Sequence, residues 1–579
     1  MRFVDSSDGT RIATYEEGNP DGPPLVLTHG WPDSHVLWDG AVPLLADRFR
    51  IIRYDNRGVG RSAAPKPARA YRMERLADDL EAVISTLSPG QPVHVLGHDW
   101  GSVATWEYLS RPGADERIAS FTSVSGPSTD HYLAAIWADL SRPYRPVRFG
   151  RALGRAARLT YMLLLAVPGL SPALIRRAFR DEARLTDRLP AAQRFRSPAA
   201  VDDAVNSSRI YRAMLLRRPR DFRTDHYVRV PVQLIVNTED PVVRPDGLDA
   251  VSQWVPRLWR RDIKAGHWAP MSHAPLIAQA VHELVDHLEG KPASRALRRA
   301  EVGPRREYFS DTLVSVTGAG SGIGRATALA FAKEGAELVV SDIDEAAAKE
   351  TAATIAARGG VAHAYGLDVS DADAVEEFVA RICAEHGVPD IVVNNAGVGH
   401  AGLFLDTPRE EYDRVLDINF GGVVNCCRSF GRRLVDRGSG GHIVNVSSMA
   451  AYSPQQTMNA YATSKAAVFM FGDCLRAELD QAGVGLTTVC PGVINTNIVH
   501  TTRFDVPEDK RAKAEARRGQ LEKFFAARRY GPEKVAKAIV ASVKSNKAVR
   551  PVAPEAYLVY GVAHLLPQVM RSTARGRVV

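Results

Sequence analysis

The residue of this chain with the most specific chemistry is an aspartate in a short glycine-rich segment. Asp99 stands in Gly97-His98-Asp99-Trp100-Gly101, directly after the apolar run at residues 93–96. A reactive residue two positions from a glycine on either side is typical of a sharp turn from a strand into a helix, where Cβ atoms do not fit. A serine at such a turn attacks esters or amides. An aspartate instead attacks an sp³ carbon and forms an alkyl-enzyme ester that water must cleave.

The residues needed to cleave such an ester follow Asp99 in the order acid, then histidine. Asp240 comes after the apolar run at residues 232–236, and His267 lies in Gly266-His267-Trp268. His267 is predicted to activate the water while Asp240 fixes its tautomer, with Glu239 as the less favoured acid. The backbone N–H groups of Trp31 and Trp100 are predicted to form the oxyanion hole. The segment at residues 55–62 is interpreted as a structural turn.

With these motifs in this order, residues 1–290 resemble the epoxide hydrolases of the α/β-hydrolase fold. The resemblance implies two tyrosines on an inserted cap, which donate protons to the epoxide oxygen as the ring opens. Tyr211, in Ile210-Tyr211-Arg212, matches the second tyrosine, and Tyr161 fits the first, with Tyr144 as its rival. The apolar residues 162–166 beside Tyr161 suit a lipophilic, lipid-like substrate.

Two other interpretations of this half remain open. Haloalkane and fluoroacetate dehalogenases share Asp99, Trp100 and His267, although Tyr211 and Trp31 favour an epoxide. Alternatively, this half is a lipid-binding or membrane-docking module for the half that follows.

A second set of motifs begins after the apolar run at residues 313–316. The segment Thr317-Gly318-Ala319-Gly320-Ser321-Gly322-Ile323-Gly324 opens a predicted helix, whose N-terminus can hold a pyrophosphate. Asp342 ends the next predicted strand, where a carboxylate binds both ribose hydroxyls and repels a 2′-phosphate. Because Ser321 also supplies no positive charge, NAD is favoured over NADP as the cofactor. The nearby Arg325 argues in the opposite direction.

Residues 311–550 resemble the short-chain dehydrogenase/reductase family. The resemblance implies that Tyr461 exchanges a proton with an alcohol or ketone oxygen, that Ser448 polarises that oxygen, and that Asn419 anchors a water relay. Lys465 lies one helical turn after Tyr461, so its ammonium is expected to lower the phenol pKa and to hold the ribose. The other residues that match the family's cofactor-binding motifs are Gly318, Ser321, Gly322, Ile323, Gly324, Asp342, Asp368, Val369, Asn395, Ala396, Gly397, Pro491, Gly492 and Thr496.

The elements that must position these residues indicate two α/β domains in the 579 residues. Apolar runs at 25–28, 51–54, 93–96 and 232–236 are predicted core strands of a mostly parallel sheet. We therefore expect an α/β-hydrolase domain at 1–290 with a helical cap at about 128–225. A linker at 291–310 and a Rossmann-type doubly wound parallel sheet at 311–579 complete the prediction.

Positive charge is concentrated in the predicted cap. The whole chain carries a net charge of +8, and residues 128–225 hold nineteen arginines against nine acids. Six arginines recur at steps of three or four, which predicts one helical face: Arg142, Arg145, Arg148, Arg151, Arg155 and Arg158. A solvated cap helix is the favoured interpretation, contact with an anionic membrane surface the second, and nucleic-acid binding is not expected.

The remaining expectations concern environment and partners. Without a recognisable signal segment, a membrane-spanning run or a metal-ligand spacing, the sequence predicts a cytoplasmic protein with five reduced cysteines and no metal. Relatives of the second domain commonly pair through the helix bearing Tyr461, so a homo-oligomer is expected from the resemblance. A chain that joins these two predicted domains is similar to actinobacterial proteins that handle lipid epoxides. One hypothesis is sequential chemistry, from epoxide to vicinal diol and then to hydroxyketone.

Overall fold

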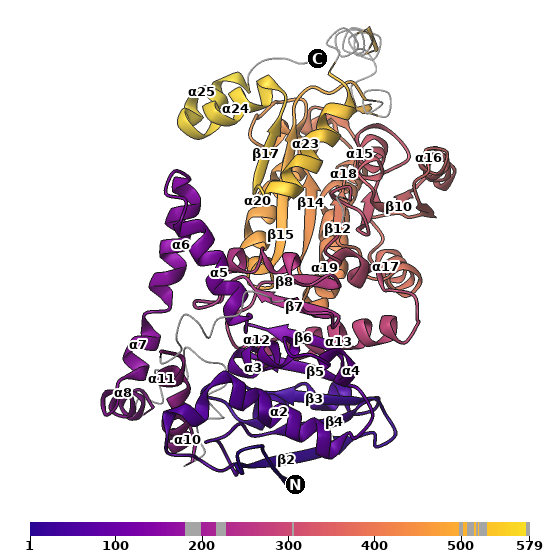
Figure 1. Cartoon of the computed structure of the whole chain (residues 1–579). Coiled ribbons are helices and arrows are strands. Elements are labelled where there is room, and N and C mark those ends of the chain that lie inside the picture. The colour runs from indigo at the N-terminus through magenta and orange to yellow at the C-terminus, as the bar shows by residue number, and fades with distance from the viewer. Residues whose placement is uncertain are drawn as a thin grey trace. The chain divides into compact units, whose positions relative to one another are not determined.

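The computed structural model describes residues 1–179, 199–215, 227–303, 306–496, 502–505, 515–516, 519 and 530–574. Residues 180–198 and 216–226 of the predicted cap lie outside the described residues. The chain divides into two compact units, Met1–Pro304 and Arg305–Val579 (Figure 1). Each unit is built around its own β-sheet.

The sheet of the first unit has eight strands in the order β1-β2-β4-β3-β5-β6-β7-β8. Strand β2 pairs antiparallel with β1 and with β4, and the strands from β4 to β8 run parallel. The four predicted core strands are confirmed as β3, β4, β5 and β7. The strands are β1 (Arg2–Asp5), β2 (Arg11–Gly18), β3 (Pro24–Thr28), β4 (Arg50–Tyr54), β5 (Val93–His98), β6 (Ile118–Val124), β7 (Val232–Asn237) and β8 (Leu258–Ile263).

Helices cover both faces of this sheet, which is why its central strands are apolar on both sides. Val26 of β3 belongs to the core cluster with Leu80 of α2, whereas its neighbour Leu27 packs in the cluster that contains Ile277 of α13. Outside the cap the helices are α1 (Val42–Leu45), α2 (Met73–Leu87), α3 (Asp99–Leu109), α4 (Ala114–Arg117), α12 (Ala269–Ser272), α13 (Ala274–Leu288) and α14 (Arg295–Ala300).

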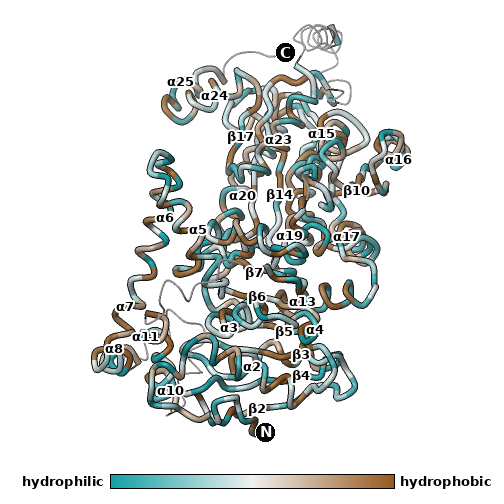
Figure 2. The backbone as a smooth tube through the Cα atoms, viewed as in Figure 1, coloured by the Kyte–Doolittle hydropathy of each residue, from teal (hydrophilic) through white to brown (hydrophobic). Residues whose placement is uncertain are grey.

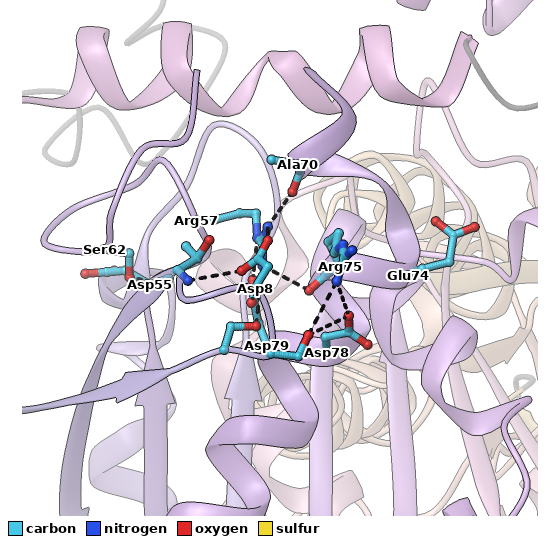
Figure 3. Close-up of polar contacts among 12 residues, drawn as sticks. Asp8, Asp55, Arg57, Ser62, Ala70, Glu74, Arg75, Asp78 and Asp79 are labelled. Carbon is cyan, nitrogen blue, oxygen red and sulfur yellow. Dashed lines mark hydrogen bonds and ion pairs between the residues drawn. The ribbon is translucent and has the colours of Figure 1, made fainter. Parts of the chain in front are cut away.

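The turn that follows β4 is held by buried charges (Figure 3). The Arg57 side chain is fully buried and donates to both carboxylate oxygens of Asp79, to Asp8 at 2.9 Å and to the carbonyl of Ala70. Asp55, in the same turn, accepts hydrogen bonds from the backbone N–H of His35 at 3.1 Å and from its own turn at Arg61. These contacts tie the N-terminal hairpin, the turn and α2 together.

The cap is inserted between β6 and β7. Its described helices are α5 (Thr129–Leu140), α6 (Pro146–Arg158), α7 (Tyr161–Ala166), α8 (Leu170–Ala178), α10 (Ala200–Ser207) and α11 (Arg209–Leu215). The prediction that six arginines share one helical face is wrong. Helix α6 begins only at Pro146, a residue suited to the first turn, so Arg142 and Arg145 precede it. Arg155 points inward and pairs with Asp139 at 2.5 Å.

The predicted linker is partly ordered structure of the first unit. Ser294 caps α14 by accepting a hydrogen bond from the backbone N–H of Leu297. Leu297 packs with Trp259 and Leu284, and the N–H of Val302 donates to the edge of β8. The buried apolar side chains of Leu297 and Ala300 hold this basic segment against the first unit, so the linker is shorter than predicted.

The second unit has a seven-stranded parallel sheet in the order β11-β10-β9-β12-β14-β15-β17, which confirms the predicted doubly wound Rossmann topology. The strands are β9 (Leu313–Thr317), β10 (Glu337–Asp342), β11 (Ala362–Gly366), β12 (Ile391–Asn394), β14 (Gly441–Val446), β15 (Val484–Pro491) and β17 (Val549–Val552), with a separate pair β13 (His400–Gly402) and β16 (Arg503–Asp505). The helices are α15 (Gly322–Lys333), α16 (Glu345–Ala356), α17 (Ala372–His386), α18 (Arg409–Leu416), α19 (Gly422–Arg437), α20 (Asn459–Asp480), α23 (Pro532–Ser545), α24 (Pro554–Leu565) and α25 (Pro567–Thr573).

Among the described residues, no single helix is long and apolar enough to cross a bilayer. The stretch Pro146–Ala166 together with Leu170–Ala178 meets the length and composition requirement only as a pair that is bent by 104°.

Candidate active sites

Asp99 occupies a strained turn between β5 and α3. Its φ of 47° lies in the left-handed region, which residues other than glycine rarely adopt. The glycines around it are required by space: a Cβ on Gly101 would lie 2.4 Å from the carbonyl oxygen of His29, and one on Gly30 would lie 2.4 Å from Asp99 Oδ2. The turn therefore pushes the Asp99 carboxylate against the loop that carries Trp31.

The Asp99 carboxylate is mostly shielded from solvent, with 17% of its side chain exposed, and it lies among backbone donors. The N–H of Trp31 donates to Oδ2 at 2.9 Å. Burial raises the pKa of Asp99 to about 6, against the lowering effects of His267 and of the backbone N–H groups of Trp31 and Trp100. The two N–H groups predicted to form the oxyanion hole thus both reach Asp99.

His267 lies between the two carboxylates. Its Nδ1 is 2.8 Å from Asp240 Oδ2, and its Nε2 is 3.8 Å from Asp99 Oδ1. Burial disfavours a charged imidazole, but the hydrogen bond to Asp240 and the charges of Asp240 and Asp99 outweigh it and raise the pKa of His267 to about 9. Glu239, the alternative acid, is mostly exposed and lies 3.8 Å from Lys264.

Sequence reasoning missed the residues that hold the His267 backbone. His98 Nε2 lies 2.9 Å from the carbonyl oxygen of His267, and Asn237 Nδ2 donates to the carbonyl of Gly266 at 2.9 Å and to Ser125 Oγ at 2.7 Å. All three lie at the carboxyl ends of neighbouring strands, the position where parallel α/β sheets carry their sites. That position was the available signal for Asn237.

The cap brings Tyr161 of α7 and Tyr211 of α11 together near the turn that carries Asp99. Their ring centroids are 5.8 Å apart. The Tyr211 ring also packs edge-to-face with Trp31 and with Trp100, each at a centroid distance of 5.4 Å. Burial, with the Asp99 charge as a further cause, raises the pKa of both phenols. Tyr144 is 72% exposed, so the rival of Tyr161 lies away from this cluster.

The glycine-rich loop of the second unit joins β9 to the N-terminus of α15. Gly318 and Gly322 have φ values of 63° and 53°, and a Cβ on Gly324 would lie 2.0 Å from the carbonyl oxygen of Gly318. Ser321 is the exposed N-cap residue, and Ile323 packs its side chain toward the core. The bare backbone at the start of this twelve-residue helix fits a diphosphate.

Asp342 lies at the end of β10, beside this loop. Its Oδ2 accepts a hydrogen bond from the N–H of Gly320 at 2.8 Å. Arg325, the residue that argued for a 2′-phosphate, donates instead to Glu350 at 2.9 Å and to Thr351 at 3.1 Å. The positive charge of Arg325 is therefore already balanced by the carboxylate of Glu350.

Asn395 ties the segment after β12 to the glycine-rich loop. Its Nδ2 donates to the carbonyls of Thr317 and Gly318, and the N–H of Ala396 donates to Thr317 Oγ1 at 3.2 Å. Gly397 must be small, because a Cβ there would lie 2.9 Å from Asn419 Oδ1 and 3.3 Å from Lys465 Nζ. The segment that contacts the glycine-rich loop therefore also contacts Asn419 and Lys465 of the predicted tetrad at Gly397.

The predicted tetrad is assembled by a π-helical turn at Asp417–Gly421 and by α20. Such turns often occur at functional sites. Asn419 is fully buried and exchanges hydrogen bonds with the backbone of Val398, and it donates to Ser464 at 3.1 Å. Lys465 Nζ donates to the carbonyl of Val446 at 3.1 Å.

The expectation that Lys465 lowers the pKa of Tyr461 stays a prediction, because burial and Ser448 are the causes that act on this phenol in the structure. Burial raises the pKa of the Tyr461 phenol, with a hydrogen bond to Ser448 acting against it. Burial also lowers the pKa of Lys465 to about 8, and its Nζ lies 5.9 Å from the centre of the Tyr461 ring. Desolvation therefore sets the direction of both shifts.

The other matched residues border the same loop. Asp368 is exposed after β11, and the buried Val369 packs against Gly422, whose Cβ would lie 2.6 Å from Val369 Cγ2. Thr496 lies beside Gly322, where a Cβ would be 3.6 Å from Thr496 Cβ. Pro491 ends β15, and Glu555, which sequence reasoning missed, approaches Gly492 and accepts from the N–H of Val493 at 2.9 Å.

One further cluster was not predicted, at the other end of the strands. Ligand atoms of Glu337, His363 and His386 lie within 4.8 Å of one another. Glu337 and His363 pair at 2.9 Å, and His386 Nε2 lies 2.6 Å from the Tyr365 hydroxyl. These groups satisfy one another without an ion.

Comparison with known proteins agrees with both domains. Family models match the alpha/beta hydrolase fold over residues 23–274 and the short chain dehydrogenase over residues 312–506. The protein is thus an enzyme that joins an α/β-hydrolase domain to a short-chain dehydrogenase domain. "Probable oxidoreductase EphD" of Mycobacterium tuberculosis is 63% identical over 584 residues, covering 100% of this chain and 99% of the relative. The chain belongs to the family of these two-domain oxidoreductases.

Other similar proteins match the second unit. The 2,3-dihydro-2,3-dihydroxybenzoate dehydrogenase of Bacillus subtilis is 37% identical over 209 residues, which cover 36% of this chain and 78% of that protein. A short chain dehydrogenase/reductase from Burkholderia phymatum, solved in complex with NAD, has 27% identity and a TM-score of 0.42, covering 46% of this chain and 97% of its own. Membership of the dehydrogenase family implies a nicotinamide cofactor.

Proposed function

We propose that the first unit hydrolyses an apolar epoxide through an ester on Asp99, and that the second unit is an NAD-dependent alcohol dehydrogenase or ketone reductase. The observation that carries the hydrolase proposal is the pair of cap phenols, Tyr161 and Tyr211, packed together near the partly exposed Asp99 carboxylate. A carboxylate alone suits several displacement reactions, but paired phenols supply the acid that an epoxide oxygen needs as it becomes an alkoxide.

In the first step an Asp99 oxygen attacks one epoxide carbon, and the C–O bond at that carbon breaks. A phenol proton passes to the departing oxygen, so the product is a hydroxyalkyl ester. In the second step His267 takes a proton from water while the water oxygen attacks the ester carbonyl. The N–H groups of Trp31 and Trp100 hold the oxyanion. As it collapses, the departing alkoxide takes the second proton of the water, which releases the diol and restores the Asp99 carboxylate. The phenol is restored by a proton from His267 before that residue acts as the base.

A dehalogenase is the second candidate, and one observation favours it. The Nε1 of Trp100 is buried beside Tyr211, makes no well-aligned hydrogen bond in the part of the chain that the structure describes, and offers a donor to a halide. The indole N–H of Trp31 does not, because it donates to the carbonyl of Ala204 at 2.9 Å. Paired phenols are not required for halide release, so the epoxide is preferred.

Single turnover in ¹⁸O-labelled water tests both the nucleophile and the substrate. If Asp99 attacks, the first diol formed carries unlabelled oxygen from the carboxylate, and mass spectrometry finds the label in the peptide that contains Asp99. Acid quenching should trap the alkyl ester on that peptide with epoxides, and Asp99→Asn should abolish it. Tyr144→Phe is the matched control for Tyr161→Phe. Turnover of haloalkanes with no turnover of epoxides would select the second candidate.

In the second unit the glycine-rich loop fits the diphosphate of the cofactor, and Asp342 fits the two hydroxyls of its adenine ribose. The bound nicotinamide would supply hydride exchange with the substrate carbon. Tyr461 exchanges the proton at the substrate oxygen, Ser448 polarises that oxygen, and Lys465 holds the nicotinamide ribose. The Arg325–Glu350 pair supports NAD over NADP, because it leaves Asp342 as the unbalanced charge. Initial rates with each cofactor test this preference.

The two activities are proposed to act in sequence, since a diol is an alcohol substrate. Purified protein given a long-chain epoxide and NAD should form diol first and NADH afterwards. Diol that accumulates without NADH would refute the coupling but would leave each separate activity intact.

A further inference from the structure

Helices α7 and α8 form an apolar arm on the cap that the proposed chemistry does not explain. Residues 159–175 contain no charged side chain. Leu163 and Leu164, on α7, are 52% and 54% exposed, and Val167, Leu170 and Leu174 continue the exposed apolar surface. Figure 2 shows the tube through α7 in brown. We call residues 159–175 the arm.

The two faces of α7 serve different purposes. Tyr161, Met162, Leu165 and Ala166 pack into the cluster that contains Tyr211, so they face the hydrolase site. Leu163 and Leu164 point the other way, and the helix has no polar face to offer to water. A helix that is apolar all round is buried in protein or in lipid. Its outward half is covered by neither in the described structure.

Arginines surround the arm. Residues 141–178 include eight arginines and no aspartate or glutamate. Arg155 is neutralised by Asp139, and Arg176 pairs with Asp202 at 3.1 Å. The exposed arginines that precede the arm are Arg142, Arg145, Arg148, Arg151 and Arg158, and Arg177 follows it. An apolar segment with positive charge at both ends complements a bilayer that has anionic headgroups.

We propose that the arm inserts into the interface of an anionic bilayer, with the flanking arginines on the lipid headgroups. The segment lies in the interface rather than spanning it, because α7 and α8 are separated by a sharp bend at Pro168-Gly169. If the first unit is the epoxide hydrolase proposed above, the bilayer is also the source of its substrate. A lipophilic epoxide in the bilayer reaches Tyr161 along the same helix that anchors the cap, without crossing bulk water.

Co-sedimentation of the full chain with vesicles tests the proposal. Vesicles of phosphatidylcholine with phosphatidylglycerol should bind the protein, vesicles of phosphatidylcholine alone should bind it much less, and added salt should weaken the binding. Arg148→Glu with Arg151→Glu should lower the affinity by about 25-fold or more, since each surface arginine is worth about fivefold. Arg257→Glu with Arg358→Glu, at exposed sites elsewhere, is the charge-matched control.

Leu163→Glu with Leu164→Glu should abolish binding, whereas Leu405→Glu with Leu565→Glu, which changes exposed leucines of the second unit, should not. Circular dichroism and thermal unfolding check the fold of each variant independently of its activity, and Leu163→Ser with Leu164→Ser is the milder replacement if the first pair fails that check. Equal binding by arm variants and controls, or no binding to anionic vesicles, overturns the proposal. If the parent does not bind vesicles and the leucine variants have a lower oligomeric mass than the parent, the proposal is overturned in favour of contact between copies.

Asp99→Asn separates this proposal from the proposed function. A variant that hydrolyses no epoxide but binds vesicles as the parent does supports docking. If the parent binds vesicles through the arm and turns over no epoxide, the hydrolase proposal fails and the docking proposal stands.

Discussion

Asp99→Asn is expected to lower the pKa of His267 strongly, by an amount set by the 3.8 Å between His267 Nε2 and Asp99 Oδ1. Opposite unit charges at this distance attract by about 4 kcal/mol when the effective dielectric constant is about 20. Since about 1.4 kcal/mol corresponds to a tenfold change, loss of the Asp99 charge shifts the protonation equilibrium roughly a thousandfold toward the neutral ring. The variant thereby imitates the ester state, in which Asp99 is also uncharged.

In the proposed mechanism, this pKa shift decides at which step His267 can act as a base. The pKa of His267 is raised to about 9 while Asp99 is a carboxylate, so the ring is protonated and cannot act as a base. In that mechanism, formation of the ester removes the Asp99 charge, and the His267 proton can then pass to the phenolate left by ring opening. The base therefore becomes available only when there is an ester to cleave.

The assay is a pH titration of the full chain carrying ¹⁵N-labelled histidine, with His267→Gln used to assign the resonance. In Asp99→Asn the His267 signal should titrate at much lower pH than in the parent. Asp240→Asn, which removes the partner at 2.8 Å, should also lower the midpoint and should alter the tautomer. A midpoint in Asp99→Asn equal to or above that of the parent would refute the reasoning, because another group would then hold the proton.

Three further outcomes are expected. The rate of ester formation should fall as the pH drops through about 6, because burial raises the pKa of Asp99 to that value and the protonated acid is not a nucleophile; a rapid-quench rate that is flat down to pH values well below this would contradict it. Tyr211→Phe should slow ester formation by about 10² to 10³-fold, as expected when one donor to a developing oxyanion is lost, with ester hydrolysis much less affected in the same experiment. Arg57→Met should destabilise the first unit by about 3–5 kcal/mol in urea unfolding, because the fully buried Asp79 loses its partner; a loss below about 1 kcal/mol would show that Asp79 is stabilised in another way.

Much of the fold was predictable because parallel strands buried on both faces are continuous apolar runs. Those runs located β3, β4, β5 and β7, and the glycine-rich segment with Asp342 located the first half of the second sheet. Chain order and strand ends also brought Asp99, Asp240 and His267 into one expected site, and the structure places them within hydrogen-bonding or ion-pairing distance.

What failed depended on partners that are distant in the sequence. The spacing of the arginines predicted a helical face, but Arg155 turns inward to Asp139, a residue of another helix. The apolar contact of Leu297 with Trp259 converts a basic segment into a packed helix. The pKa of Tyr461 could not follow from its spacing to Lys465, since burial of both groups decides it. Local spacing carries no information on burial.

The left-handed backbone conformation of Asp99 lowers the stability of the first unit at the residue that its proposed chemistry requires. A φ of 47° costs a residue with a side chain on the order of 1 kcal/mol, which glycine does not pay. Asp99→Gly would relieve that strain, but it would also remove the charge that faces His267 and the acceptor of the Trp31 N–H, so a net gain in stability is not expected. Anyone engineering a hardier first unit should therefore hold residue 99 fixed and look for gains elsewhere.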